Sequence, residues 1–166
     1  YQESFGPDPR LASENFDKLR EKISLLREYE TELVCVGVSP HAVYTVCAPL
    51  IEMLSRYAVD EKLPVMMHAA ESEAEDLLVR KGVGPFALNL AQRGIEWRAP
   101  GVSVIEYLEQ AGLFSARPLL AHCIRTNEDD IERIRIAGAG IAHCPKSNAK
   151  LDHGRAPFAA FINGGA

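Results

Sequence analysis

Apolar residues are concentrated in four short runs along the chain, each bounded by polar or turn-forming residues. The runs cover residues 33–38, 64–70, 118–123 and 139–144. They are nearly continuous rather than alternating, which is typical of parallel strands covered on both faces. The pattern therefore predicts four buried parallel strands.

Helical periodicity fills the segments between these runs. Two helices are predicted by apolar positions that recur on one helical face, namely Phe16, Leu19, Ile23 and Leu26 after Asp8-Pro9, and then Leu50, Met53, Leu54 and Tyr57. Three more helix starts are indicated by a hydroxyl residue three positions before a carboxylate, as in a capping box, at Ser72, Ser103 and Thr126. The long segment between the second and third strands carries extra helices around residues 85–93 and 103–111. Strands that alternate with helices predict a parallel α/β architecture in one domain.

Composition narrows the class of protein. The chain is 47% hydrophobic and 25% charged, with a net charge of −5, which is typical of a globular protein and argues against nucleic-acid or anionic-membrane partners. No apolar run approaches the roughly 20 residues that span a bilayer, and no signal peptide is recognisable. The four cysteines lack CxxC spacing, so we expect reduced thiols and a cytoplasmic location. Because the sequence begins at Tyr1 and ends in mid-pattern, we expect it to be a piece of a longer protein.

Histidines mark the carboxyl ends of the predicted strands. His41, His68, His122 and His143 each stand at or just after the end of an apolar run, whereas His153 lies in a glycine-rich loop and is expected to be exposed. In parallel α/β sheets this edge is where ligands bind. We therefore expect the four strand-end histidines to converge.

The segment His68-Ala-Ala-Glu71 carries the clearest chemical signal. A neutral imidazole is a good zinc or iron ligand, and a glutamate three residues later can move protons to and from a metal-bound water. The alternative is a core histidine satisfied by a backbone carbonyl, with Glu71 favouring the next helix start.

Four segments together resemble the amidohydrolase superfamily, in its deaminase and chlorohydrolase branch. They are Ser-Pro-His41-Ala, His68-Ala-Ala-Glu71, Ala-His122-Cys and Ala-His143-Cys-Pro-Lys-Ser-Asn148. The resemblance implies that residues 1–166 are a partial TIM-barrel domain, approximately strands four to seven, with a helical insertion after strand five. It also implies a small heterocyclic substrate.

The resemblance assigns a role to each matching residue. His68 would be the metal ligand, Glu71 the general acid and base, and His122 a group that orients the attacking water. His41 would contact the substrate, and Asn148, with its neighbour Ser147, would stiffen the following loop. The metal would be one divalent ion, zinc by preference or iron.

The departures from the family pattern matter equally. No two histidines are separated by one residue, so the HxH ligand pair of the first strand is absent, and so is the aspartate of the eighth strand. A catalytic zinc site takes about three protein ligands. We therefore expect an incomplete site that does not retain the metal by itself, and unpaired sheet edges that favour a homo-oligomer.

The implied activity is hydrolytic deamination of an amino-substituted heterocycle of purine or nucleoside type. Two alternatives stay open at this point. One is hydrolysis of chloro- or alkylamino-triazines on the same scaffold. The other is a non-catalytic half-barrel.

Overall fold

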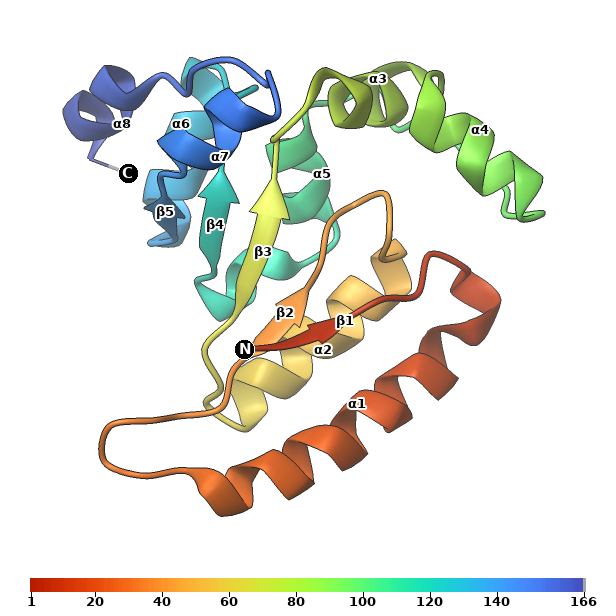
Figure 1. Ribbon diagram of the computed structural model, residues 1–166, viewed down its shortest axis with the longest axis vertical. Coiled ribbons are helices and arrows are strands. Elements are labelled where there is room, and N and C mark those ends of the chain that lie inside the picture. Colours follow the sequence, from red (N-terminus) through yellow and green to blue (C-terminus); the bar gives the residue numbers. More distant parts are fainter. Residues whose placement is uncertain (166) are drawn as a thin grey trace.

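Five short parallel strands lie side by side in chain order at the centre of the molecule (Figure 1). The computed structural model describes residues 1–165. β1 pairs with β2, and β3 with β4 and β4 with β5, while a parallel bridge between Val38 and Val65 connects the two groups. The strands are β1 (Gln2–Ser4), β2 (Val38–Pro40), β3 (Met66–Ala69), β4 (Leu119–His122) and β5 (Gly140–Ala142). The predicted parallel α/β architecture is confirmed.

The first predicted strand is wrong in position. Residues 33–37 are outside β2, and Leu33 is 96% exposed. Backbone hydrogen bonds to the neighbouring segments begin only at Gly37 and Val38. The carbonyl of Gly37 accepts the N–H of Gln2, and the N–H of Val38 donates to the carbonyl of Pro64. The neighbour β1 was not predicted because its three residues are Gln, Glu and Ser, without an apolar signal.

Helices connect the strands, and the first six agree with the predicted segments, whereas the last two, after β5, were not predicted. They are α1 (Ala12–Leu26), α2 (Ala48–Asp60), α3 (Glu73–Lys81), α4 (Pro85–Gln92), α5 (Val104–Gln110), α6 (Glu128–Ala137), α7 (Pro145–Lys150) and α8 (Phe158–Gly164). Three 3-10 segments accompany them, at Pro9–Leu11, Arg27–Tyr29 and Leu113–Ala116. No helix among residues 1–165 is both long and apolar enough to cross a membrane.

The predicted start of α6 is wrong by one residue. Asn127, not Thr126, caps this helix, since its side chain accepts the N–H of Asp130 at 2.8 Å. The Asp130 carboxylate in turn accepts the N–H of Asn127 at 3.0 Å, which completes a capping box. Thr126 instead donates its hydroxyl to the carbonyl of Cys123.

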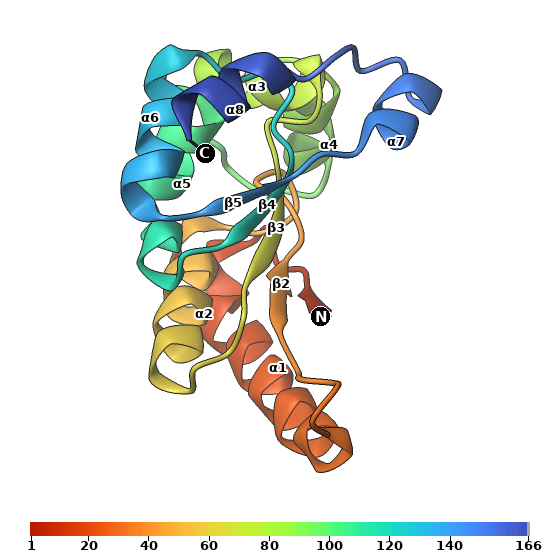
Figure 2. The same cartoon turned by 90° about the vertical axis from the view of Figure 1, so that its left-hand side faces the viewer.

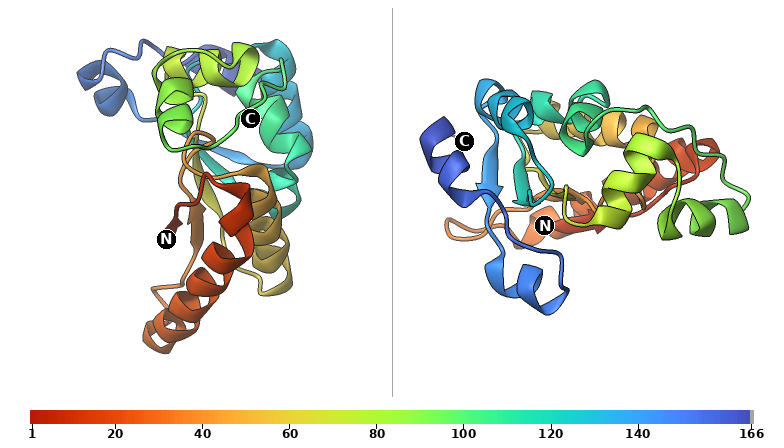
Figure 3. Two further views of the ribbon diagram at one scale, coloured as in Figure 1. Left: turned by 90° about the vertical axis from the view of Figure 1, so that its right-hand side faces the viewer. Right: turned by 90° about the horizontal axis from the view of Figure 1, so that it is seen from above.

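Helices cover one face of the strands rather than both. Figures 2 and 3 show α2, α5 and α6 along one side, and α1 packs against β1 and α2. Met67 and Leu120 point into this covered side and are fully buried, whereas Met66 and His68 are partly exposed on the other. On the second side Figure 2 shows α7 at the carboxyl ends of the strands, and no helix of residues 1–165 runs along their length. The strands therefore present one open face, and His68 lies on it.

Two apolar clusters support this arrangement. The main cluster joins the covered face of the strands to buried positions of the flanking helices, including Leu54, Ile105 and Ile134. A smaller cluster under α3 and α4 consists of Leu78, Leu90 and Ile95. Of the four thiols, Cys35 is exposed, contrary to the strand predicted around it.

Candidate active site

Three of the four strand-end histidines lie in a row at the carboxyl edge of the strands. His41 directly follows β2, His68 lies within β3, and His122 is the last residue of β4. The ring centres of His41 and His68 are 4.9 Å apart, and those of His68 and His122 are 5.5 Å apart. The fourth, His143, is not part of this row, because its ring stacks on Phe158 at 5.1 Å.

Each ring in the row is held through its Nδ1 atom. His68 Nδ1 donates to the backbone carbonyl of His41 at 3.0 Å, and His122 Nδ1 donates to Oδ1 of Asn148 at 2.8 Å. His41 Nδ1 lies 2.8 Å from the Thr45 hydroxyl, which itself donates to Ala42. The Nε2 atoms of all three rings are therefore left with a lone pair. A ligating histidine in proteins is usually fixed in this way through its other nitrogen.

Glu71 faces this row from the loop after β3. Its Oε1 lies 3.4 Å from Nε2 of His122 and 3.8 Å from Nε2 of His153. Only 14% of the Glu71 side chain is exposed, so a proton placed between these groups is largely shielded from solvent. His153 was predicted to be exposed, and this was wrong, since the loop after α7 folds back toward Glu71.

Left-handed backbone conformations set the direction of these side chains. Ala70 has φ 51°, His122 has φ 73° and Cys123 has φ 47°. Such conformations cost about 1–3 kcal/mol each in non-glycine residues and are concentrated at functional sites. They are held by hydrogen bonds between the two strand ends, because the carbonyl of Ala70 accepts the N–H groups of Ile124 and Arg125 at 2.8 and 2.9 Å.

Glu3 is a site residue that the sequence reasoning missed. It belongs to β1, and one carboxylate oxygen lies within 4.8 Å of ring nitrogens of His41 and His68, which likewise lie within that distance of each other. Oxygen and imidazole nitrogen are ligands that suit zinc and iron. Burial and the neighbouring His68 lower the pKa of His41, which favours the neutral ring that metal binding or hydrogen-bond acceptance needs. The donor set thus fits a divalent metal.

Asn148 has a different role from the one implied by the resemblance. Its carboxamide does not bond the local backbone. Instead, from its place in α7, it accepts the Nδ1 proton of His122 in β4 and so orients that ring. The side chain is 1% exposed, and its Nδ2 has no protein partner among the described residues. No side-chain hydrogen bond that would stiffen the loop is found for Ser147 within residues 1–165.

The insertion after β3 reaches the site through an aromatic contact. Phe86 of α4 stacks on Tyr44 with ring centres 3.9 Å apart, and Tyr44 in turn meets the His41 ring edge-on at 5.9 Å. Burial raises the pKa of Tyr44 to about 12, so the phenol stays neutral. Tyr44, backed by Phe86 of α4, therefore forms one wall beside His41.

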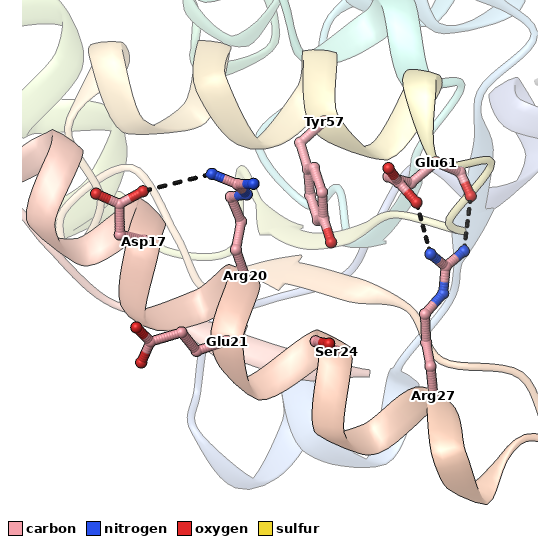
Figure 4. Close-up of a pocket in the computed structure, with 7 residues that line it drawn as sticks. All are labelled: Asp17, Arg20, Glu21, Ser24, Arg27, Tyr57 and Glu61. Carbon is pink, nitrogen blue, oxygen red and sulfur yellow. Dashed lines mark hydrogen bonds and ion pairs between the residues drawn. The ribbon is translucent and has the colours of Figure 1, made fainter.

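A cavity of about 580 Å³ lies away from the strand ends. It is a groove between α1 and α2 lined mainly by charged side chains (Figure 4). Arg27 and Glu61 pair within it, as do Asp17 and Arg20. A second cavity of about 380 Å³ is lined by Ser72 and His153 among others, but by none of the three histidines of the row. The strand-end histidines and Glu71 thus lie outside the groove between α1 and α2.

The chain is similar in sequence to known deaminases. The chain is 34% identical to the aminodeoxyfutalosine deaminase of Deinococcus radiodurans over 99% of its own length, and 31% identical over 88% to the 5-methylthioadenosine/S-adenosylhomocysteine deaminase of Pelotomaculum thermopropionicum. It spans 42% and 30% of these two relatives.

Solved structures show the same fold. The aminofutalosine deaminase of Helicobacter pylori superposes with a TM-score of 0.87 over 99% of this chain and 41% of that one, at 19% identity. An adenosine deaminase of Xanthomonas campestris with bound zinc superposes with a TM-score of 0.70 over 93% of this chain and 31% of that one, at 26% identity. Residues 5–166 match the Amidohydrolase family. This match, together with the strand-end histidines and the similarity to deaminases, shows that the chain belongs to the amidohydrolase family.

Proposed function

We propose that the protein to which this chain contributes is a metal-dependent deaminase that hydrolyses the exocyclic amine of a purine-type nucleoside. The observation that carries the proposal is the placement of Glu71 against His122, beside the free Nε2 of His68, in a chain that is 34% identical to an aminodeoxyfutalosine deaminase. We further assign β2 to β5 to strands four to seven of a (β/α)8 barrel, which makes β1 the third. The open face of the strands would then be the barrel interior.

The residues divide the reaction between them. Water adds to the ring carbon that bears the amine, the carbon–nitrogen bond breaks, and ammonia leaves. Glu71 Oε1 accepts a proton from the attacking water and returns it to the departing nitrogen. His122 fixes the position of the water and holds the proton on Glu71 in place, while His41 contacts the substrate.

A divalent metal, zinc by preference, would be held by His68 Nε2 with ligands contributed from outside this sequence. When bound, it lowers the pKa of water toward about 7 and so supplies a nucleophile at neutral pH. Glu3 and His41 lie close enough to His68 to complete the surroundings of such an ion.

The names of its relatives support this substrate class. They include deaminases named for aminodeoxyfutalosine, methylthioadenosine and S-adenosylhomocysteine, all of which carry a 6-aminopurine. The triazine hydrolases that share the fold are 21–22% identical, which supports a common architecture only.

The test measures ammonia release by the complete protein from these nucleosides and chloride release from a chlorinated triazine. Glu71→Gln should lower kcat by about 10²–10⁴-fold with metal content retained, whereas His68→Ala should lose the metal. His143→Asn is the matched control and should keep both. Near-normal turnover by Glu71→Gln, or a preference for the triazine, would contradict the proposal. A complete protein without bound metal would favour the non-catalytic alternative.

A further inference from the structure

Glu75 is a completely buried acid directly behind the proposed proton carrier. It lies in the first turn of α3 and its exposure is 0%. A buried carboxyl group is costly unless its oxygens are hydrogen-bonded. Here only Oε2 has a partner, while Oε1 has none among the described residues. A side chain retained at this cost calls for an explanation beyond helix formation.

The partner of Glu75 is the backbone of Glu71. Oε2 accepts the Glu71 N–H at 2.7 Å. In an ordinary capping box the carboxylate bonds the N–H of the capping residue itself, and α6 shows that arrangement between Asp130 and Asn127. In α3 the cap is Ser72, but the carboxylate bonds the preceding residue instead. The bond that would complete the capping box is thus shifted by one position, from the N–H of Ser72 to that of Glu71, the proposed proton carrier.

The displaced bond closes the turn that directs Glu71. Ala70, immediately before it, is left-handed, and its carbonyl is held from the β4 side by the N–H groups of Ile124 and Arg125. Glu75 holds the other side of the same turn. Since the Glu71 carboxylate lies 3.4 Å from His122, a small rotation of this backbone would separate the two.

We propose that Glu75 is a positioning residue, which holds the Glu71 backbone so that its carboxylate faces His122 and the attacking water. It touches neither substrate nor metal and acts only through Glu71. The inference rests on the proposed function, because it gives Glu75 a purpose only if Glu71 carries the proton. Burial raises the pKa of Glu75 to about 8, so near neutral pH it is mainly a neutral acid whose carbonyl oxygen accepts the bond.

The experiment compares Glu75→Leu with Glu75→Gln in the complete protein. Leucine removes the acceptor, and kcat should fall by about 10- to 100-fold, the usual cost of a misplaced catalytic group, with KM and metal content nearly unchanged. Glutamine keeps an acceptor oxygen and should retain most of the turnover. Asp130→Leu removes the corresponding bond in α6 and should lower stability without lowering kcat.

A double-mutant cycle decides whether the effect passes through Glu71. In a Glu71→Gln background, Glu75→Leu should cause no further loss. Wild-type kcat in Glu75→Leu, or an equal loss in both backgrounds, would overturn the inference. If Glu71→Gln itself keeps its turnover, the proposed function has failed instead. Should Glu75→Leu not fold, Glu75→Asp serves in its place, since it withdraws the carboxylate by one methylene and should show the same kcat loss.

Discussion

Nε2 of His122 lies 3.4 Å from Oε1 of Glu71, although the two residues belong to the ends of different strands. Both atoms are hydrogen-bond acceptors when the ring is neutral and the carboxyl is ionised. The pair is therefore suited to hold one proton between them, which is the property that a proton carrier in hydrolysis requires. The geometry of the pair depends on a few supporting side chains.

Asn148 is one of these supports, and its removal should impair catalysis. Asn148→Ala takes away the acceptor of the His122 Nδ1 proton, and the ring is then free to rotate. We expect kcat to fall by about 10- to 100-fold, as for other orienting partners, with the metal retained. Asn148→Asp keeps an acceptor oxygen for this proton and should retain most of the turnover. Unchanged kinetics in both variants would contradict this role.

The burial of Glu75 should also make stability depend on pH. Its pKa is raised from 4.5 to about 8, mainly by burial, and Glu71 adds to the rise. Between these values the folded protein holds a proton on Glu75 that the unfolded chain has lost. The contribution of Glu75 to stability is therefore fully present below pH 4.5 and is lost as pH rises through about 8. We expect a loss of about 3–5 kcal/mol across this window.

Urea unfolding at pH 5 and pH 8 measures this effect. The side chain of Glu75→Gln cannot titrate, so this variant should lack the pH dependence that Glu75 causes. The histidines are the same in both proteins, and the difference between wild type and variant therefore isolates the contribution of Glu75. Parallel pH dependence in the two proteins would show that Glu75 does not titrate in this range.

The observed cap of α6 makes a prediction that the sequence pattern did not. Asn127→Ala should lower the free energy of unfolding by about 1 kcal/mol, whereas Asn127→Gly should cost only a few tenths. Chemical denaturation of both variants measures the difference. Wild-type stability in Asn127→Ala would mean that the Asn127 side chain contributes no capping bond.

Much of the fold could be predicted because apolar runs and helix caps are local signals. The spacing of apolar and helix-capping residues alone predicts the strands around His68, His122 and residues 140–142, together with the helices between them. Strand β2 could not be placed in this way. The run from Leu33 is as apolar as a buried strand, but Leu33, Val34 and Cys35 are exposed and pair with no strand of residues 1–165. Burial depends on the neighbours that a segment meets in the fold.

The site was predicted in part for a related reason. His41, His68 and His122 end strands, so their convergence follows from the parallel topology. Glu3 belongs to a strand whose sequence is polar, and His153 reaches Glu71 through a loop whose path depends on tertiary contacts. Neither carries a local signal. The hydrogen bond between Asn148 and His122 could not be predicted either, because His122 lies 26 residues away on β4.

The spacing of the three histidine rings is close to the spacing of neighbouring strands, about 4.8 Å, with ring centres 4.9 and 5.5 Å apart. The row thus contains one ring for each of β2, β3 and β4, and the rings are spaced as the neighbouring strands are. A slip of β3 by one residue against β4 would move His68 by about 3.3 Å along the sheet and turn its ring toward the covered face. Errors in strand pairing during folding would therefore abolish the chemistry even where the molecule remains compact, so specific activity measures correct register.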